Sequence, residues 1–222
     1  MFLGHFAVSL GAKKPAPSLS LGTLFLAAQF VDLLWPLFLL LGIEHARIDV
    51  GNTAVTPLDF YDYPFTHSLA GAILWSCVLA LLYYALKHNV RNALIIGAGV
   101  ASHWVLDFLT HRPDLPLWFS GGPHFGLGLW NSMVGTVVVE VGLFLLGLFL
   151  YLRTTTAKDK IGSIGFWTLV GFLGLIYLGN LAGPPPPDVP SIAVVGNSMW
   201  LLVLWAYWVD RHRTVLDAVR KS

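Results

Sequence analysis

Long apolar stretches dominate the chain, and short segments rich in proline, glycine and charged residues separate them. A helix needs about 20 apolar residues to cross a bilayer. Six stretches have about this length, at residues 20–42, 66–86, 92–110, 131–152, 162–181 and 191–209. Backbone amides must be paired inside hydrocarbon, and helices satisfy this requirement within a single segment. The pattern therefore predicts an all-α, polytopic membrane helix bundle with six transmembrane helices.

The first twelve residues are apolar too, but they are too few to span a bilayer, and Lys13 follows them. We expect a short N-terminal re-entrant segment or half-helix. His5 lies eight residues before Lys13, which places it roughly 12 Å into the bilayer at about 1.5 Å per residue. We expect residues 1–222 to form a single integral membrane domain. Residues 1–152 carry the motifs, and residues 153–222 add two further spans and a basic tail.

Composition supports lipid as the solvent. Hydrophobic residues make up 56% of the chain and charged residues 11%, whereas a soluble domain has about 25% charged residues. The mean hydropathy is +0.70. The formal net charge of +1 is uninformative, because in a membrane protein the placement of charge matters more than its sum. With lipid as the solvent and no nucleotide-binding glycine signature in the sequence, we expect membrane lipid as a partner and no nucleic acid.

Lysine and arginine fall mainly on one side of the predicted bundle. Eleven are on that side, and only Arg47 and Arg112 are on the other. Cytoplasmic loops are the ones that carry this excess. We therefore expect both ends of the chain in the cytoplasm. The eleven residues are Lys13, Lys14, Lys87, Arg91, Arg153, Lys158, Lys160, Arg211, Arg213, Arg220 and Lys221.

Several ionisable side chains lie inside the predicted spans. At about 1.5 Å per residue, Asp32 lies roughly 15 Å from the outer end of its span, Glu140 near 14 Å and His103 near 10 Å. Asp107 follows His103 by one helical turn plus about 40°, and His67 opens the second span. A charge near the bilayer centre costs at least about 2.5–3.5 kcal/mol, so these groups need a common partner.

A divalent cation is the partner that suits this mixture of carboxylates and imidazoles. Zinc fits it best, with manganese or iron as alternatives. The expected ligands are His5, Asp32, His67, His103 and Asp107.

Three residues are candidates for catalysis. Asp107 or Glu140 would act as general base if it does not bind the metal, although Glu140 could instead be protonated or hydrogen-bonded to a neighbouring helix. His111 could be a ligand, a partner of a ligand or a proton shuttle. The acidic loop LDFYDYP is expected to be solvated, but Asp59 and Asp62 lie just before His67 and are further candidates.

Small residues in the third and fifth spans favour close helix contacts, although scattered glycine is also ordinary in membrane helices. They are Gly97, Gly99 and Ala101 in the third span, and Gly171, Gly174 and Gly179 in the fifth.

The ordered fragments GH, an acidic residue in the first span, FTHSL and ASHWVLD resemble the YdjM-like family of predicted inner-membrane metal-dependent hydrolases. The matching positions are Gly4-His5, Asp32, Thr66-His67-Ser68 and Ser102-His103 with Asp107, within residues 1–152. The resemblance implies a membrane-embedded, metal-binding hydrolase, located in a prokaryotic cytoplasmic (inner) membrane. That pattern often has a doubled acid and a histidine after the first span, and a basic residue before TH. This chain has FVDLLWP and DYPFTH in those places.

A more distant resemblance is to zinc-dependent phospholipase C and related nucleases, whose final HxxxE helix would correspond to TVVVE, with Thr136 in place of the histidine. This departure favours one or two metal ions.

The sequence thus predicts a hydrolase that uses a metal-activated water on a lipid, a phosphoester or another small molecule. A cation or proton transporter with a midplane polar site is the first alternative. A non-catalytic scaffold whose metal staples the helices is the second.

Overall fold

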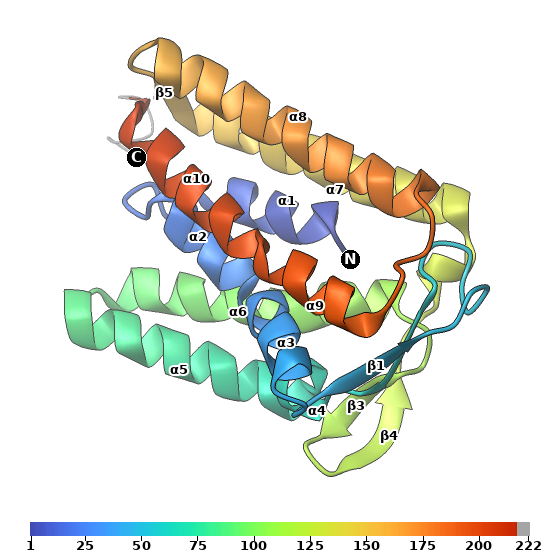
Figure 1. The fold of residues 1–222 in the computed structure, drawn as a ribbon. Helices are drawn as coiled ribbons and strands as arrows, with labels where there is room; N and C mark the ends of the chain where they lie inside the picture. The colour runs from blue at the N-terminus through green and yellow to red at the C-terminus, as the bar shows by residue number, and fades with distance from the viewer. Residues whose placement is uncertain (217–222) are drawn as a thin grey trace.

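The computed structural model describes residues 1–216, which are mostly helical. The long helices are α5 (Leu69–Lys87), α6 (Val90–Thr110), α7 (Met133–Thr154) and α8 (Lys160–Ala182). The shorter ones are α1 (Leu3–Ala12), α2 (Leu21–Ala28), α3 (Phe30–Leu40), α4 (Pro64–His67), α9 (Val189–Asn197), α10 (Met199–Arg211) and the 3₁₀ helix η1 (Leu129–Asn131). The expected helical bundle is confirmed for the described residues (Figure 1).

Five helical segments are long and apolar enough to cross a membrane: α5, α6, α7, α8 and the stretch Val189–Arg211 that contains α9 and α10. The first predicted span is not one straight helix, because α2 and α3 meet at Gln29 with a bend of 57°. Counting this bent pair gives six. The break frees the Ala28 carbonyl from the helix ladder, and it accepts a hydrogen bond from His103 instead.

The expectation of an all-α chain is wrong for the loops. They contain three two-stranded antiparallel sheets, in which β1 pairs with β2, β3 with β4, and β5 with β6. Pairing satisfies backbone groups that no helix takes up. The strands are β1 (His45–Ile48), β2 (Leu58–Asp62), β3 (Leu115–Trp118), β4 (Gly121–Phe125), β5 (Thr155–Ala157) and β6 (Arg213–Val215).

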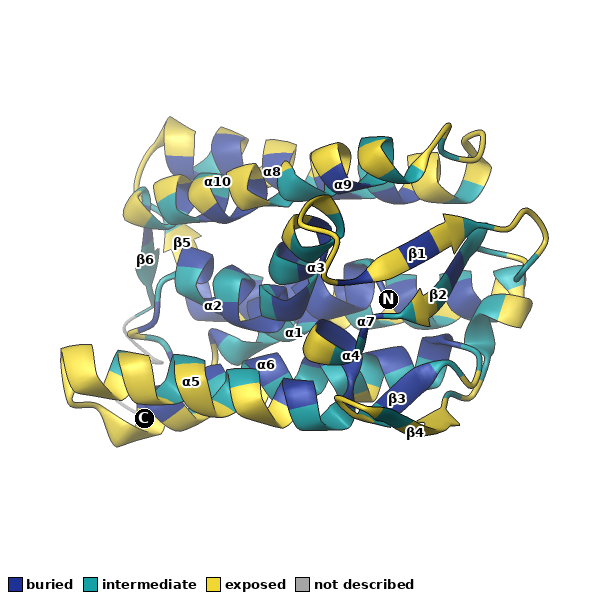
Figure 2. Ribbon diagram, turned by 60° about the horizontal axis from the view of Figure 1, so that its bottom comes forward, coloured by how far each residue is buried: buried dark blue, intermediate teal, exposed yellow. Residues whose placement is uncertain are grey.

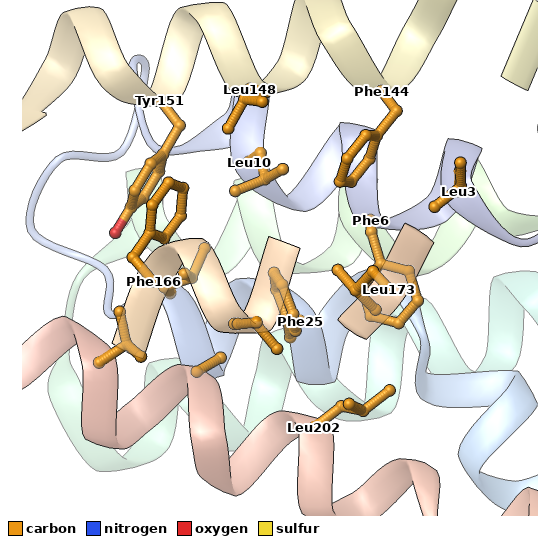
Figure 3. Packing of buried hydrophobic residues seen from close by; sticks show 14 of the residues in the cluster. Leu3, Phe6, Leu10, Phe25, Phe144, Leu148, Tyr151, Phe166, Leu173 and Leu202 are labelled. Atoms are coloured by element: carbon orange, nitrogen blue, oxygen red, sulfur yellow. The ribbon is translucent and has the colours of Figure 1, made fainter. Parts of the chain in front are cut away.

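Helix α1 lies inside the bundle, where it packs against α7, α2 and α6 (Figure 1). Its apolar side chains Leu3, Phe6 and Leu10 are buried in one cluster with residues of α2, α7, α8 and α10 (Figure 3). At Gly147 of α7 an added Cβ would lie 2.4 Å from the Ala7 carbonyl oxygen. A glycine at this position therefore allows the two helix backbones to approach closely.

The glycines of the third and fifth predicted spans behave differently. Added Cβ atoms at Gly97 and Gly99 would lie 3.3 Å from Ala80 and 3.2 Å from Ala27, so α6 packs closely on α5 and α2 there. At Gly171, Gly174 and Gly179 an added Cβ meets nothing within 4 Å. The expectation of close helix contact at these three positions of α8 is therefore wrong.

Large apolar side chains point outward along the long helices. Leu81 on α5, Leu145 on α7, Leu175 on α8 and Leu204 on α10 are all more than half exposed, and exposed residues recur along α5, α8 and α10 in Figure 2. Water would penalise such a surface, whereas lipid would not. The outer surface is therefore that of a membrane protein.

The bundle has two different ends. At one, which we call the basic end, Lys13 pairs with Asp210 at 3.0 Å, and β5 pairs with β6. The other, the hairpin end, carries the pairs β1–β2 and β3–β4 (Figure 1). Two of the basic residues assigned to the first side, Arg220 and Lys221, lie outside the described residues.

Candidate metal centre

All five predicted ligands come together in one cluster, although they belong to four helices. His5 lies on α1, Asp32 in the first turn of α3, and His67 at the end of α4, while His103 and Asp107 lie one turn apart on α6. Four of them are buried, and Asp32 is partly exposed. Whether they bind a metal stays a prediction.

Two imidazole nitrogens face two carboxylates. Nε2 of His103 lies 3.1 Å from Oδ2 of Asp107 and 3.4 Å from Oδ1 of Asp32. Nε2 of His67 lies 3.3 Å from the same Asp32 oxygen and 3.8 Å from the same Asp107 oxygen. The edge of a tetrahedron with metal–ligand bonds of about 2.0 Å is roughly 3.3 Å. Three of these four distances, 3.1, 3.3 and 3.4 Å, are therefore close to the spacing of two ligands on one ion.

His5 lies at the other oxygen of Asp107. Its Nε2 is 3.1 Å from Oδ1, and the Met1 nitrogen donates to the same oxygen at 2.5 Å. The His5 ring stacks on the His103 ring, with centroids 3.6 Å apart and planes within 4° of parallel. Asp107 thus stands between two groups of nitrogen atoms, one at each carboxylate oxygen.

Hydrogen bonds on the far side of the rings determine which nitrogen of each imidazole faces the cluster. Nδ1 of His103 lies 2.8 Å from the Ala28 carbonyl, which can only accept, so Nδ1 carries the hydrogen. Nδ1 of His67 lies 2.6 Å from the Thr66 hydroxyl, whose own hydrogen goes to Glu44 at 2.7 Å. Both rings, when neutral, therefore present a bare Nε2, as metal-binding histidines usually do.

The donor set fits a divalent metal. Nε2 of His103 is buried without a hydrogen-bond partner among residues 1–216. Bare imidazole nitrogens and carboxylate oxygens are all acceptors, so they do not stabilise one another without a proton or a cation between them. Two overlapping groups have ligand atoms within 4.8 Å of one another: His5, His103 and Asp107, and Asp32, His67 and His103. The buried cluster could hold a metal ion.

His111 lies at the rim of the cluster, where α6 ends. Its Nε2 is 4.0 Å from Oδ2 of Asp107, and its Nδ1 is 2.9 Å from Oδ1 of Asp114. The Tyr63 hydroxyl donates to the same Asp114 oxygen at 2.9 Å, and the Trp130 ring lies 4.2 Å from the imidazole. Asp114 thus orients His111 with Nε2 toward the centre.

Glu140 is not part of either group of clustered ligand atoms found among the described residues. Its Oε2 accepts from the backbone nitrogens of Phe2 and Leu3, at 2.9 and 2.7 Å. It therefore caps the start of α1, which matches the alternative of a hydrogen bond to a neighbouring helix. Equal depth along separate spans does not by itself bring two side chains together.

The acidic loop before His67 is tied by ion pairs. Asp59 is buried and contacts the guanidinium groups of Arg47, at 2.6 Å, and Arg112. Asp62 pairs with His45 at 2.8 Å on the exposed surface. The expected solvation is therefore wrong for Asp59, and both carboxylates have partners other than the clustered imidazoles.

Two residues that support the cluster were not predicted from the sequence. Glu44 accepts from the backbone nitrogens of Phe65 and Thr66, and burial raises the pKa of its carboxyl. Asp114 holds His111. Both lie in loops, where no periodic pattern indicates which way a side chain faces. The one usable signal is the spacing of His111 and Asp114, which puts an acid three residues after a histidine.

Comparison with protein-family models, with curated proteins and with solved structures finds no match to this chain. The geometry of the cluster and the motifs of the sequence are therefore what indicate a function.

Proposed function

We propose that this protein is a membrane-embedded, metal-dependent hydrolase with zinc as the preferred ion and manganese or iron as alternatives. The observation that carries the proposal is the meeting of two bare imidazole nitrogens with Asp32 and Asp107 at the spacing of metal ligands. The resemblance to the YdjM-like family supports the same activity. It also supports the inner membrane as the location.

The chain supplies the ligands and their orientation. Asp32, His67, His103 and Asp107 would hold the ion. Nε2 of His5 lies 3.1 Å from Oδ1 of Asp107, the other oxygen of that carboxylate. A bound divalent metal polarises a carbonyl or phosphoryl oxygen and lowers the pKa of its water from 15.7 toward about 7.

The cluster is accessible on the side of Asp32. The Asp32 side chain is 27% exposed, against 1% for His103 and 2% for Asp107. A substrate therefore approaches from the Asp32 side, while His111, held by Asp114, is positioned to take or give a proton at Nε2. The substrate we propose is a lipid ester or phosphoester, or a small molecule with the same reactive group.

One observation favours transport as a second candidate. The helix break between α2 and α3 lies beside the cluster, and both polar atoms of the buried Gln29 amide lack a partner within residues 1–216. Broken helices at buried polar sites are common in transporters. Flux of zinc or manganese into proteoliposomes, lost in the Gln29→Leu variant, would favour this candidate over hydrolysis.

The first test is the metal content of protein purified in mild detergent. We expect the wild type to retain zinc in a stoichiometric amount, and His103→Ala to lose at least nine-tenths of it, because Nε2 of His103 contacts both carboxylates. His124→Ala is the matched control, since His124 is exposed on β4. Both variants should elute from size exclusion like the wild type. Full metal content in a well-folded His103→Ala protein would refute the ligand assignment.

A further inference from the structure

A cavity of about 420 Å³ lies at the hairpin end of the bundle, outside the metal cluster. The loop 50–58 forms one side of it. The last turn of α8, with the proline-rich connector at residues 183–186, forms the other. Phe2, Trp130, Glu140 and Tyr177 complete the lining. Its volume is within the range of small-molecule sites, about 300–1,000 Å³.

The cavity and the metal cluster share a wall. Phe2 follows Met1, whose nitrogen lies 2.5 Å from Oδ1 of Asp107. On the other side, the Trp130 ring lies 4.2 Å from the ring of His111, whose Nε2 is 4.0 Å from Oδ2 of Asp107. A molecule in the cavity is therefore separated from the cluster by a single layer of residues.

The cavity offers no uncompensated charge. Among residues 1–216, no lysine or arginine lines it, and the one acidic side chain that does, Glu140, accepts from the backbone nitrogens of Phe2 and Leu3. The rest of the lining is aromatic rings, aliphatic side chains, prolines, and neutral hydroxyl and amide groups. An anionic headgroup buried there would find no cation to offset the free-energy cost of its desolvation. A hydrocarbon chain carries no charge and needs no such partner.

The cavity also lies where a lipid can reach it. It is formed at the hairpin ends of α7 and α8, and the outer faces of these helices carry exposed apolar side chains such as Val138 and Leu178. We propose that this cavity binds the hydrocarbon chain of an uncharged lipid ester. The ester's hydrolysis rests on the proposed function, but the binding of the chain does not.

Gly179 allows a direct test. It lines the cavity, and a Cβ added there meets nothing within 4 Å, so Gly179→Trp places bulk in the cavity without a backbone clash. Gly174→Trp is the matched control, because Gly174 lies on the same helix with equally open space but does not line the cavity. The probe is a monoacylglycerol with a photoreactive alkyl diazirine, used in detergent on metal-free protein.

We expect the wild type to crosslink at residues 50–58 and 179–186, and unlabelled monoacylglycerol to compete. Gly179→Trp should reduce crosslinking at these residues at least fivefold, while Gly174→Trp leaves it unchanged. Equal crosslinking at residues 50–58 in both variants would overturn the proposal, as would competition by an anionic lysophospholipid but not by monoacylglycerol. Because the metal-free protein is used, this result does not depend on hydrolysis. Binding of the lipid chain without its hydrolysis by the metal-loaded protein would count against the proposed function only.

Discussion

Thr66 connects a loop carboxylate to a histidine of the cluster. Its hydroxyl donates to Glu44 and can therefore only accept from Nδ1 of His67, which leaves Nε2 bare. The hydroxyl bonds the side of the His67 ring that faces away from the carboxylates, so its contribution is to fix the tautomer and direction of the ring. Partners of this kind typically contribute 10–100-fold to metal affinity or activity.

Replacement of this hydroxyl should weaken metal binding without unfolding the protein. We expect Thr66→Val to lower zinc affinity by about 10–100-fold and Thr66→Ser to retain wild-type affinity, because serine keeps the donor and the acceptor. Competition with a chromogenic chelator measures both. Thr168→Val is the control, since its hydroxyl bonds only to the backbone of α8. Equal affinities for the valine and serine variants at position 66 would contradict this role.

The sequence predicts the clustered residues better than it predicts Glu44 and Asp114, which hold imidazoles in and beside the cluster in place. His103 and Asp107 were found because an ionisable group inside an apolar span needs a partner, and their spacing put them on one face. Glu44 and Asp114 lie in loops, where the direction of a side chain depends on contacts distant in sequence. Glu140 has the right depth but faces α1, since depth gives no information about rotation around the bundle.

At the scale of elements, α1 is a core helix and not a membrane-facing one. Seven of its ten residues are buried, and α7 approaches it at Gly147. The sequence predicted its length and position but not its surroundings, because an apolar ten-residue helix reads the same in lipid and in a protein core. The sequence does not indicate the bend at Gln29 either, because the Ala28 carbonyl left free there bonds to His103, 75 residues away.

The contact between α1 and α7 can be tested at Gly147. A Gly147→Leu side chain would clash with the Ala7 backbone, so we expect a loss of about 1–3 kcal/mol of stability and weaker zinc retention as His5 moves. Gly142→Leu on the same helix is the control, because a Cβ there meets nothing within 4 Å. Thermal unfolding in detergent compares the two. Identical midpoints would show that the close approach does not matter for stability.

At the scale of the whole molecule, the two ends differ in charge as the positive-inside rule requires. Lys13, Lys158 and Arg213 lie at the basic end, where they make hydrogen bonds to neighbouring segments. The hairpin end holds the cavity. The span count differs from the sequence prediction only by how the bent pair is counted.

Cysteine labelling tests this orientation. In a Cys77→Ser background, which removes the single native thiol, Ser120→Cys probes the hairpin end and Lys158→Cys the basic end. Both positions are exposed. We expect a membrane-impermeant maleimide to label Ser120→Cys in intact cells, and Lys158→Cys only after permeabilisation. The reverse pattern would invert the orientation.

The enclosed position of α1 constrains biogenesis. His5 and its partner Asp107 are separated by 102 residues, so at about 5–20 residues per second the ribosome needs roughly 5–20 s to produce the partner. Until α6 and α7 emerge, α1 lacks two of the helices against which it packs. It must therefore stay at the translocon or the membrane surface. Binding of the proposed metal would therefore be a late event, and a nascent chain that stalls before α6 would be a ready substrate for quality-control proteases.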